Sequence, residues 1–180
     1  LGDLKGDYFA LEMWHETGAQ REGILRRDTD FRASEEDFVL SGPHIFVANP
    51  IYKTPRAICT QNSHYDVVDL ERIPDDYRPR SNYVRAIEIA AYVAATFRAP
   101  WRDPGTSDPK PVTDYWRIVC RRGAHPGDER SLRPVIIPPH ISHIYSALSV
   151  GFRDDSTLVA TAGYWSSLPV DFFIRVSGKK

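Results

Sequence analysis

The chain is poor in sulfur: its 180 residues include two cysteines, Cys59 and Cys120, and a single methionine. Two cysteines build neither a multi-disulfide scaffold nor a four-cysteine zinc site, and free thiols are typical of a reducing compartment. Long apolar runs are also missing, since none approaches the ~20 residues of a membrane-spanning helix, and residues 1–10 lack the pattern of a signal peptide. We therefore expect a cytoplasmic protein with no membrane partner.

Motifs of catalysis are equally scarce. The sequence has no Gly-x-Ser-x-Gly elbow and no glycine-rich turn that would cradle a phosphate or S-adenosylmethionine. His140 and His143 are three residues apart, but the Pro-Pro pair before them favours a strand, in which an odd spacing puts two side chains on opposite faces. We expect no catalytic residue, no metal and no cofactor within the chain.

The composition is that of a folded globular domain. Hydrophobic residues make up 42% of the chain and charged residues 26%. A length of 180 residues suits one well-buried domain and is short for two. We predict a single domain over residues 1–180, and a chain that begins without Met suggests a fragment of a larger polypeptide.

Charge is unevenly placed along the sequence. The net charge is -1, but residues 1–37 hold ten acids and five bases, whereas residues 77–133 hold eleven bases and six acids. An unevenly charged solvated surface is one explanation of this pattern. The other is a site for a polyanion in the second half of the chain.

The most regular part of the sequence predicts three strands. Residues 115–120 and 132–137 are aromatic and β-branched, and the link 123–128 is rich in Gly and Pro, as in a hairpin with a long loop. Residues 144–152 follow the Pro-Pro pair and should return as a third strand. Arginines gather on this hairpin and its link, which again indicates a polyanion: Arg117, Arg121, Arg122, Arg130 and Arg133.

The rest of the chain predicts short elements. Strands are expected at 8–14, 38–40, 45–47 and 65–70, and a polar loop at 15–23. Ser34 before three acids is typical of a helix cap, and a helix is expected at 83–96. Residues 157–165 and 168–176 each follow a polar cluster and predict helices, although 157–162 also fits a strand. The fold class is therefore α+β, with a mixed or antiparallel sheet and a few short helices.

A second cluster of candidate binding groups lies at residues 78–83. Arg78, Arg80, Asn82 and Tyr83 are of the types that bind phosphates, hydrogen-bond to purine edges and pack on bases. A proline-stiffened surface loop is the alternative. The predicted DNA contacts of the whole chain are His15, Gln20, Arg21, Lys53, Arg56, Arg78, Arg80, Asn82, Tyr83, Arg121, Arg122 and Arg130. Within this set we assign base edges to Arg80, Asn82 and the loop from His15 to Arg21, and phosphates to Lys53 and Arg56.

One tetrapeptide resembles a catalytic loop. Asn49-Pro-Ile-Tyr is similar to the Asn-Pro-Pro-Tyr loop with which amino-methyltransferases hold a flipped adenine. Its third position differs, and the partner glycine loop for S-adenosylmethionine is absent from the sequence. We interpret the segment as a proline-punctuated turn.

Several longer stretches resemble one family. They are Glu12-Met-Trp-His-Glu-Thr-Gly-Ala-Gln-Arg, Ser41-Gly-Pro-His-Ile-Phe-Val-Ala-Asn-Pro-Ile-Tyr-Lys-Thr-Pro-Arg, Tyr65-Asp-Val-Val-Asp-Leu, Ile73-Pro-Asp-Asp-Tyr, Pro79-Arg-Ser-Asn-Tyr and Val135-Ile-Ile-Pro-Pro. Together they resemble the target-recognition region of large bacterial adenine-specific DNA methyltransferases of fused restriction-modification type and their phage-defence relatives. The closing segment from Trp165 is similar to the last helix of many such regions, with Trp165 where Asn is typical.

The resemblance implies a module that recognises double-stranded DNA in sequence-specific fashion and is not catalytic alone. Its other partner would be the methyltransferase domain of the parent chain, which would hold S-adenosylmethionine. Two other classes of function stay open. The chain could be a catalytic fragment, either a methyltransferase using Asn49 or a nuclease, although Asp66, Asp69 and Glu71 have no lysine nearby. It could also be a protein-interaction module that uses the aromatic segment 164–173.

Overall fold

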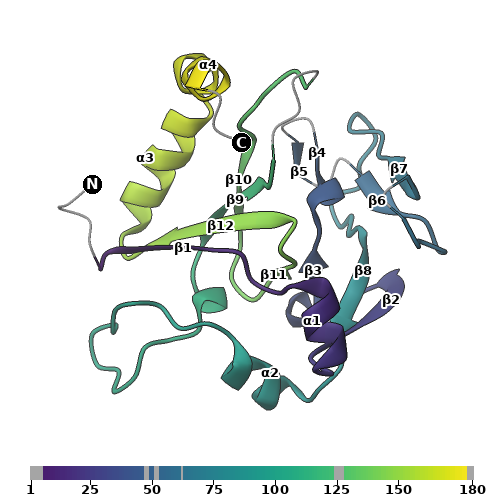
Figure 1. The fold of residues 1–180 in the computed structure, drawn as a ribbon, viewed down its shortest axis with the longest axis horizontal. Coiled ribbons are helices and arrows are strands. Elements are labelled where there is room, and N and C mark those ends of the chain that lie inside the picture. Colours follow the sequence, from purple (N-terminus) through teal and green to yellow (C-terminus); the bar gives the residue numbers. More distant parts are fainter. Residues whose placement is uncertain (1–5, 47–48, 51–52, 62, 124–127, 178–180) are drawn as a thin grey trace.

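The computed structural model describes residues 6–46, 49–50, 53–61, 63–123 and 128–177. Over these residues the chain forms one four-stranded sheet, four two-stranded sheets and a few short helices (Figure 1). The α+β class with mainly antiparallel strands, predicted from the sequence, is confirmed.

The central sheet consists of β1 (Tyr8–Leu11), β9 (Arg117–Arg121), β10 (Pro134–Ile137) and β12 (Ala147–Phe152). Its order is β1-β12-β9-β10, and every neighbouring pair is antiparallel. The predicted hairpin is confirmed as β9 and β10, and the predicted third strand as β12. Most of the link between β9 and β10, residues 124–127, lies outside the described residues.

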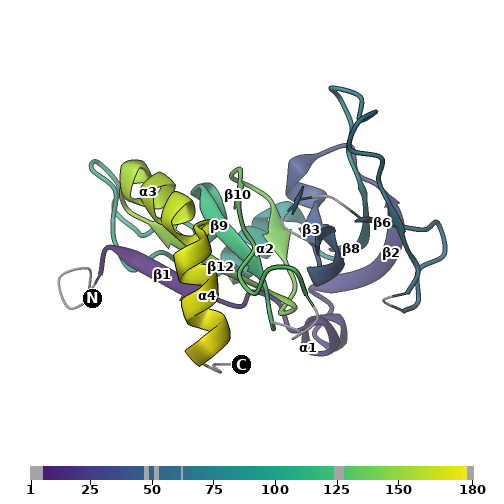
Figure 2. The same ribbon diagram turned by 90° about the horizontal axis from the view of Figure 1, so that it is seen from above.

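The two faces of the central sheet bury different partners. Ile118 and Cys120 of β9 and Val150 of β12 pack against the helix α3 (Asp155–Trp165), which contributes Leu158 and Ala162. On the other face Val119 packs with Val135 and Ile137, and with Phe38, Leu40 and Ile45 from earlier in the chain. This division follows from the strand period of two, which sends successive side chains to opposite faces. Figure 2 shows α3 and α4 (Leu168–Ser177) on one side of the molecule and β2, β6 and β8 on the other.

Both C-terminal helices were predicted, and both are confirmed. Asp154 caps α3, because its carboxylate accepts a hydrogen bond of 2.8 Å from the backbone N–H of Thr157. Helix α4 is fixed to the rest of the chain by Asp171, which accepts hydrogen bonds from the backbone N–H groups of Ser131 and Leu132 at 2.7 and 2.9 Å.

The remaining elements are short. In chain order they are α1 (Glu16–Arg21), β2 (Leu25–Phe31), the 3-10 turns η2 (Glu35–Asp37) and η3 (Gly42–His44), β3 (Val39–Leu40), β4 (Ile45–Phe46), β5 (Asn49–Pro50), β6 (Lys53–Pro55), β7 (Tyr65–Val67), β8 (Arg80–Arg85), α2 (Ile89–Ala95), η4 (Val112–Asp114) and β11 (Ser142–His143). The antiparallel pairs are β2 with β8, β4 with β5 and β6 with β7, whereas β3 and β11 are parallel.

Several predicted boundaries were wrong. Residues 83–85 belong to β8, which pairs with β2, so the helix predicted at 83–96 is reduced to α2. The polar loop predicted at 15–23 contains α1, for which His15 acts as the N-cap. The strands predicted at 8–14 and 65–70 end at Leu11 and Val67. Ser34 does cap η2, as predicted, by accepting a hydrogen bond from the backbone of Glu36.

A buried cluster joins the central sheet to the elements around α1 and β8. Phe9, Trp14, Tyr83 and Tyr92 belong to it, and the backbone of Trp14 pairs with that of Ile144. The parallel pair of β3 and β11 makes a second connection. The chain therefore leaves the central sheet after β1 and returns to it only at β9.

Among the residues that the structure describes, no helix is both long and apolar enough to cross a membrane.

Candidate functional site

The described part of the chain has a polar concavity of about 640 Å³. Its lining residues come from the ends of β9 and β11, the turn before β12, α1, β8 and the β6–β7 hairpin. Figure 1 shows where these elements lie in the fold. We call this concavity the polar cleft. Its lining residues are Glu16, Thr17, Gln20, Arg27, Ser41, Gly42, Pro43, Lys53, Thr60, Gln61, Tyr65, Asn82, Tyr83, Arg121, Arg122, Ile144, Tyr145 and Ser146.

Strand alternation explains how β9 serves both the core and the cleft. Arg117, Val119 and Arg121 point to the same face of the central sheet, away from α3. Arg117 is fully buried, whereas Arg121 at the end of the strand reaches the cleft. The prediction that the hairpin arginines together indicate a polyanion site was therefore wrong for Arg117. It was also wrong for Arg133, which is 3% exposed and is paired with Asp128.

The charge of the polar cleft is strongly positive. Arg27, Lys53, Arg121 and Arg122 are the basic lining residues, and Glu16 is the acidic one. Arg122 also forms an ion pair of 3.2 Å with Glu12, but both side chains are about half exposed, so solvent screens this pair. A net charge of +3 around one cleft favours an anionic ligand, although the chain as a whole carries -1.

Aromatic rings lie beside these cations. The guanidinium carbon of Arg27 lies 5.7 Å from the ring centre of Tyr83, and that of Arg122 lies 5.7 Å from the ring centre of Tyr145. His15 stacks on Tyr145 with a centroid distance of 4.8 Å and an interplanar angle of 23°. Cation–aromatic contacts of this kind hold long side chains in place at a cleft wall.

Asn82 places a buried amide at the cleft. It is 3% exposed, and its side-chain oxygen accepts a hydrogen bond of 2.6 Å from the hydroxyl of Thr29 on β2. This bond fixes the side chain, because β2 and β8 are paired strands. Fixed amides are the side chains that hydrogen-bond to adenine edges in DNA complexes.

A chain of hydrogen bonds supports the wall formed by Ser41 and Tyr65. The Ser41 hydroxyl lies 2.8 Å from the Tyr65 hydroxyl and 3.0 Å from Nδ1 of His44, and Nε2 of His44 donates to the carbonyl of Arg80 at 2.9 Å. That donation puts the imidazole proton on Nε2, because a carbonyl only accepts. Burial lowers the pKa of His44 and raises the pKa of Tyr65, so both groups are neutral near pH 7.

The pKa of Tyr83 is raised as well, and burial is again the main cause. Burial raises its pKa first, and the carboxylate of Glu16, 3.4 Å from its hydroxyl, raises it further. The phenol therefore donates to Glu16. This contact ties α1 to β8 across one side of the cleft.

The structure brings six of the twelve predicted contact residues together in the polar cleft. These are Gln20, Lys53, Asn82, Tyr83, Arg121 and Arg122, and His15 lies beside them on Tyr145. The residues outside the cleft lining are Arg21, Arg56, Arg78, Arg80 and Arg130.

Of these five arginines, all but Arg21 have local contacts, and Arg21 lies exposed at the end of α1. Arg56 pairs with Asp66 at 2.8 Å, and Arg78 donates to the carbonyl of Ala33 at 2.9 Å. The Arg80 guanidinium lies over the ring of Phe31, 4.4 Å from its centre.

Arg130 lies at the junction of α3 and α4. It donates to the carbonyl of Ser166 at 2.7 Å and lies 3.5 Å from the carboxylate of Asp171. It does not share a surface with the cleft residues.

Sequence analysis missed several residues of the cleft, notably Arg27, Tyr65 and Tyr145. Arg27 lies in β2, a polar segment in which no strand was predicted, and its position follows only from the pairing with β8. Tyr65 was placed on a predicted strand, but its partner Ser41 is 24 residues away in sequence. No local signal marks either contact.

The Asn49 segment is described in part. The turn predicted for this segment was wrong for its first two residues, because Asn49–Pro50 is the short strand β5, whose backbone pairs antiparallel with Ile45–Phe46. Val47, Ile51 and Tyr52 lie outside the described residues.

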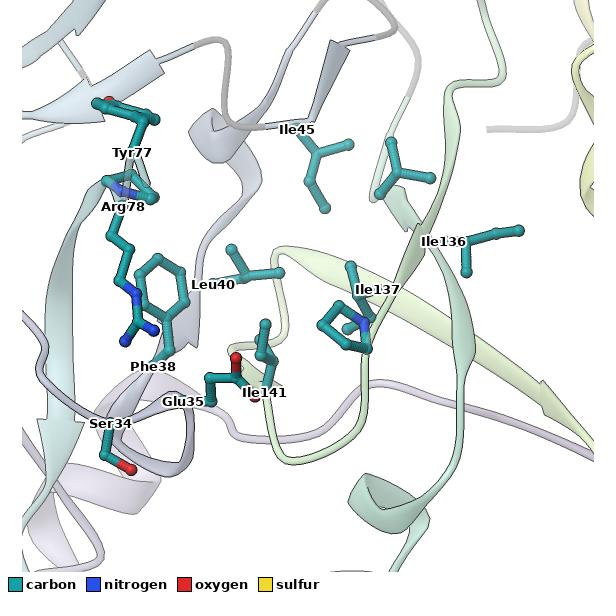
Figure 3. Close-up of a pocket in the computed structure, with 13 residues that line it drawn as sticks. Ser34, Glu35, Phe38, Leu40, Ile45, Tyr77, Arg78, Ile136, Ile137 and Ile141 are labelled. Atoms are coloured by element: carbon teal, nitrogen blue, oxygen red, sulfur yellow. The ribbon is translucent and has the colours of Figure 1, made fainter. Parts of the chain in front are cut away.

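A second concavity is smaller and apolar. It has a volume of about 320 Å³ and lies between η2, β3, the segment 77–79 and β10. Figure 3 shows Arg78, Glu35 and Ser34 along one side, next to Phe38, with Leu40 and Ile137 farther in. It has one arginine and one carboxylate, so it lacks the excess of positive charge found in the polar cleft.

The described residues contain no group of three or more His, Cys, Asp or Glu side chains placed to hold a metal ion. His143 is fully buried, and burial lowers its pKa to about 3, so its imidazole is neutral at pH 7. Burial also lowers the pKa of the neighbouring Arg117, to about 10, which leaves its guanidinium charged.

Comparison with protein-family models, with curated proteins and with solved structures found no significant match for the chain.

Proposed function

We propose that the chain is a DNA target-recognition module and that double-stranded DNA docks over the polar cleft. The observation that carries this proposal is the grouping of Arg27, Lys53, Arg121 and Arg122 around one cleft, with Glu16 as the single acid among its described lining residues. Cationic side chains bind phosphates and release condensed counterions, which is the main source of affinity for DNA.

The cleft also has groups of the kind that distinguish bases. Gln20 and Asn82 carry amides, which read adenine edges, and the guanidinium planes of Arg27 and Arg122 can stack on bases. We assign sequence discrimination to the amides and positioning on the backbone to Lys53, Arg121 and Arg122. Arg56, Arg78, Arg80 and Arg130 have a smaller part in this assignment, because they lie outside the cleft lining.

The resemblance of the sequence to recognition regions supports a specific parent enzyme. We propose an adenine-specific DNA methyltransferase of restriction-modification or phage-defence type, in which another domain binds S-adenosylmethionine and transfers the methyl group. The module alone would then bind DNA weakly and would not methylate it.

Salt dependence tests the proposal directly. With about four phosphate contacts, the logarithm of the binding constant should fall with the logarithm of salt concentration at a slope of about -3.6, or roughly hundredfold between 50 and 200 mM. Fluorescence anisotropy of a labelled duplex measures this. Binding that is absent at the lowest salt, or indifferent to salt, contradicts the proposal.

Matched variants locate the interface. Arg121→Gln should weaken duplex binding and reduce the salt slope by about 1. The control is Arg153→Gln, which removes the same charge next to Asp7 at the far end of β12, roughly 20 Å from Ser146. Equal losses in the two variants would mean that DNA does not dock over the polar cleft.

Helix α4 supports a second function, contact with another protein domain. Leu168, Phe172 and Phe173 on this helix are exposed by 70, 66 and 67%. We propose that these side chains pack on the methyltransferase domain of the parent chain. In that chain, Phe172→Ser should lower the melting temperature of the whole protein more than it does in the 180-residue chain, and equal changes would count against the contact.

A further inference from the structure

We propose that the polar cleft takes in a single unstacked nucleotide of the bound DNA and reads its base at Asn82. This inference rests on the proposed function, since the nucleotide comes from DNA held over the cleft. It concerns a nucleotide that is recognised, and no chemical step occurs on it in this chain.

The depth of the cleft separates its groups into two classes. Asn82 is 3% exposed, Ser41 3%, Tyr83 5% and Tyr65 8%, whereas Arg122 at the cleft rim has a side chain that is 54% exposed. A side chain that reads a base pair inside a duplex must project into a groove about 8.5 Å deep. The rim arginine can do so, but the buried groups cannot reach out of the cleft.

The size of the cleft fits one nucleotide. Its volume of about 640 Å³ lies within the range of roughly 300–1,000 Å³ that is usual for small-ligand sites. A double helix is far too wide to enter such a space. A base can therefore meet the buried amide of Asn82 only after it has left the stack, as happens in proteins that flip a nucleotide into a pocket.

The chemistry of the walls matches the parts of a nucleotide. The guanidinium groups of Arg27 and Arg122, which lie against the rings of Tyr83 and Tyr145, are exposed flat surfaces on which a base can stack. The amide of Asn82 can hydrogen-bond to the edge of a base, and Lys53 supplies a positive charge for a phosphate. The apolar pocket of Figure 3 lacks this combination, with Glu35 and Arg78 as its charged lining residues.

The contact with Thr29 makes the inference more specific. Because the Asn82 oxygen accepts the hydroxyl proton of Thr29 at 2.6 Å, its amide N–H groups are the part directed to a ligand. Such a donor suits a base edge with acceptors, such as N7 of a purine or O4 of thymine.

The test compares three duplexes of equal length with the full 180-residue chain: one matched, one with a single mismatch and one with a single-nucleotide bulge. Extruding a nucleotide costs less free energy in the second and third, so these should bind tenfold or more tightly than the matched duplex at the same salt concentration. A 2-aminopurine at the unpaired position should change its fluorescence on binding, because its stacking partners change.

Two variants connect the effect to the cleft. Thr17→Trp places a large side chain on α1 at the cleft wall without removing a charge, and should bring the ratio of mismatched to matched affinity close to one. Val159→Trp is the control, since Val159 is 59% exposed on α3, outside the cleft lining, and should leave the ratio unchanged. An unchanged ratio in Thr17→Trp would overturn the inference.

The outcomes separate the two proposals. Salt-dependent binding with equal affinity for all three duplexes would overturn the nucleotide pocket and leave DNA recognition standing. Binding of no duplex at low salt would overturn both. Binding of deoxynucleoside monophosphates by calorimetry, with no affinity for any duplex, would show a site for free nucleotides and overturn both as well.

Discussion

Gly151 lies opposite Phe9 in the central sheet, and a Cβ atom built on it would be 2.3 Å from Cζ and 2.6 Å from Cε1 of the Phe9 ring. Carbon atoms in contact are normally about 3.5–4.0 Å apart. In Gly151→Ala the ring must therefore retreat by about 1 Å or more. It has little room, because Phe9 is 8% exposed and stacks on Trp101 with a centroid distance of 5.6 Å and an angle of 23°.

The free energy of unfolding should fall by about 3 kcal/mol in Gly151→Ala. Overpacking of a core costs about 1–3 kcal/mol, and a displaced aromatic contact adds about 0.5–1.5 kcal/mol. Phe9 stands to lose two such contacts, with Trp101 and with Tyr115. Replacing a glycine in a strand by alanine stabilises the fold by only about 0.5–1 kcal/mol, which offsets a small part of this loss. For a chain of this length the loss corresponds to a melting temperature lower by roughly 6–12 °C.

Thermal and urea unfolding of wild type and variant measure this effect. Gly163→Ala is the matched control, because Gly163 lies within α3 and a Cβ there meets no atom within 4 Å, so it should stabilise by up to about 1 kcal/mol. In a double-mutant cycle, Phe9→Leu should recover part of the loss caused by Gly151→Ala. A Gly151→Ala variant as stable as wild type would refute the packing of β1 against β12 described above.

Three further predictions concern stability. Burial lowers the pKa of His143 to about 3, so below pH 6.5 the unfolded chain binds a proton that the folded chain does not. The free energy of unfolding should therefore decrease as the pH is lowered, by about 2 kcal/mol at pH 5. Urea unfolding of His143→Asn should show a smaller loss, and an identical pH profile would contradict this cause. Asp154→Ala removes the cap of α3 and should lower the free energy of unfolding in urea by about 1 kcal/mol. The neighbouring Asp155 makes no cap bond, so Asp155→Ala should cost less. A reversed order of the two losses would be inconsistent with the cap. Asp171→Ala leaves two partly buried backbone N–H groups without this acceptor and should cost about 1–2 kcal/mol. Faster hydrogen exchange in α4 and at Ser131 and Leu132 is the expected sign, and unchanged exchange rates would argue against the anchor.

The central sheet was predictable because its strands carry a regular pattern. In β9, Ile118 and Cys120 pack against α3, whereas Arg117 and Val119 point to the opposite face of the sheet. The turn residues at 123–128 mark the hairpin independently of that pattern. Where local pattern and turn chemistry agree, the pairing follows.

Elements that depend on distant partners were not predictable in the same way. The segment Leu25–Phe31 carries one apolar residue at its start and one at its end, and forms β2 only because β8 lies beside it. Tyr83 to Arg85 show helical spacing with the apolar residues of 87–95, but their backbone pairs with β2 instead. In both cases the tertiary environment decides between strand and helix, as β-propensity is strongly context-dependent.

The residues of the candidate site were also predictable only in part. Asn82, Lys53 and Arg121 were named from their side-chain types, and the fold brings them to one cleft. Residue type alone could not distinguish Arg121 from Arg117, which is on the same strand and the same face but is fully buried. The difference arises because Arg117 lies against Met13 and Ile141 in the core, whereas Arg121 lies at the end of the strand.

The position of β1 at the edge of the central sheet affects how the protein is made. Phe9 pairs with Gly151, so β1 emerges from the ribosome about 140 residues before its partner strand exists. At roughly 5–20 residues per second, this strand waits about 7–28 seconds with its backbone unpaired. During that interval Tyr8, Phe9 and Leu11 form a short apolar segment that is open to wrong pairing. We expect the yield of folded protein in cells to depend on chaperones that hold the N-terminal segment until β12 has been synthesised.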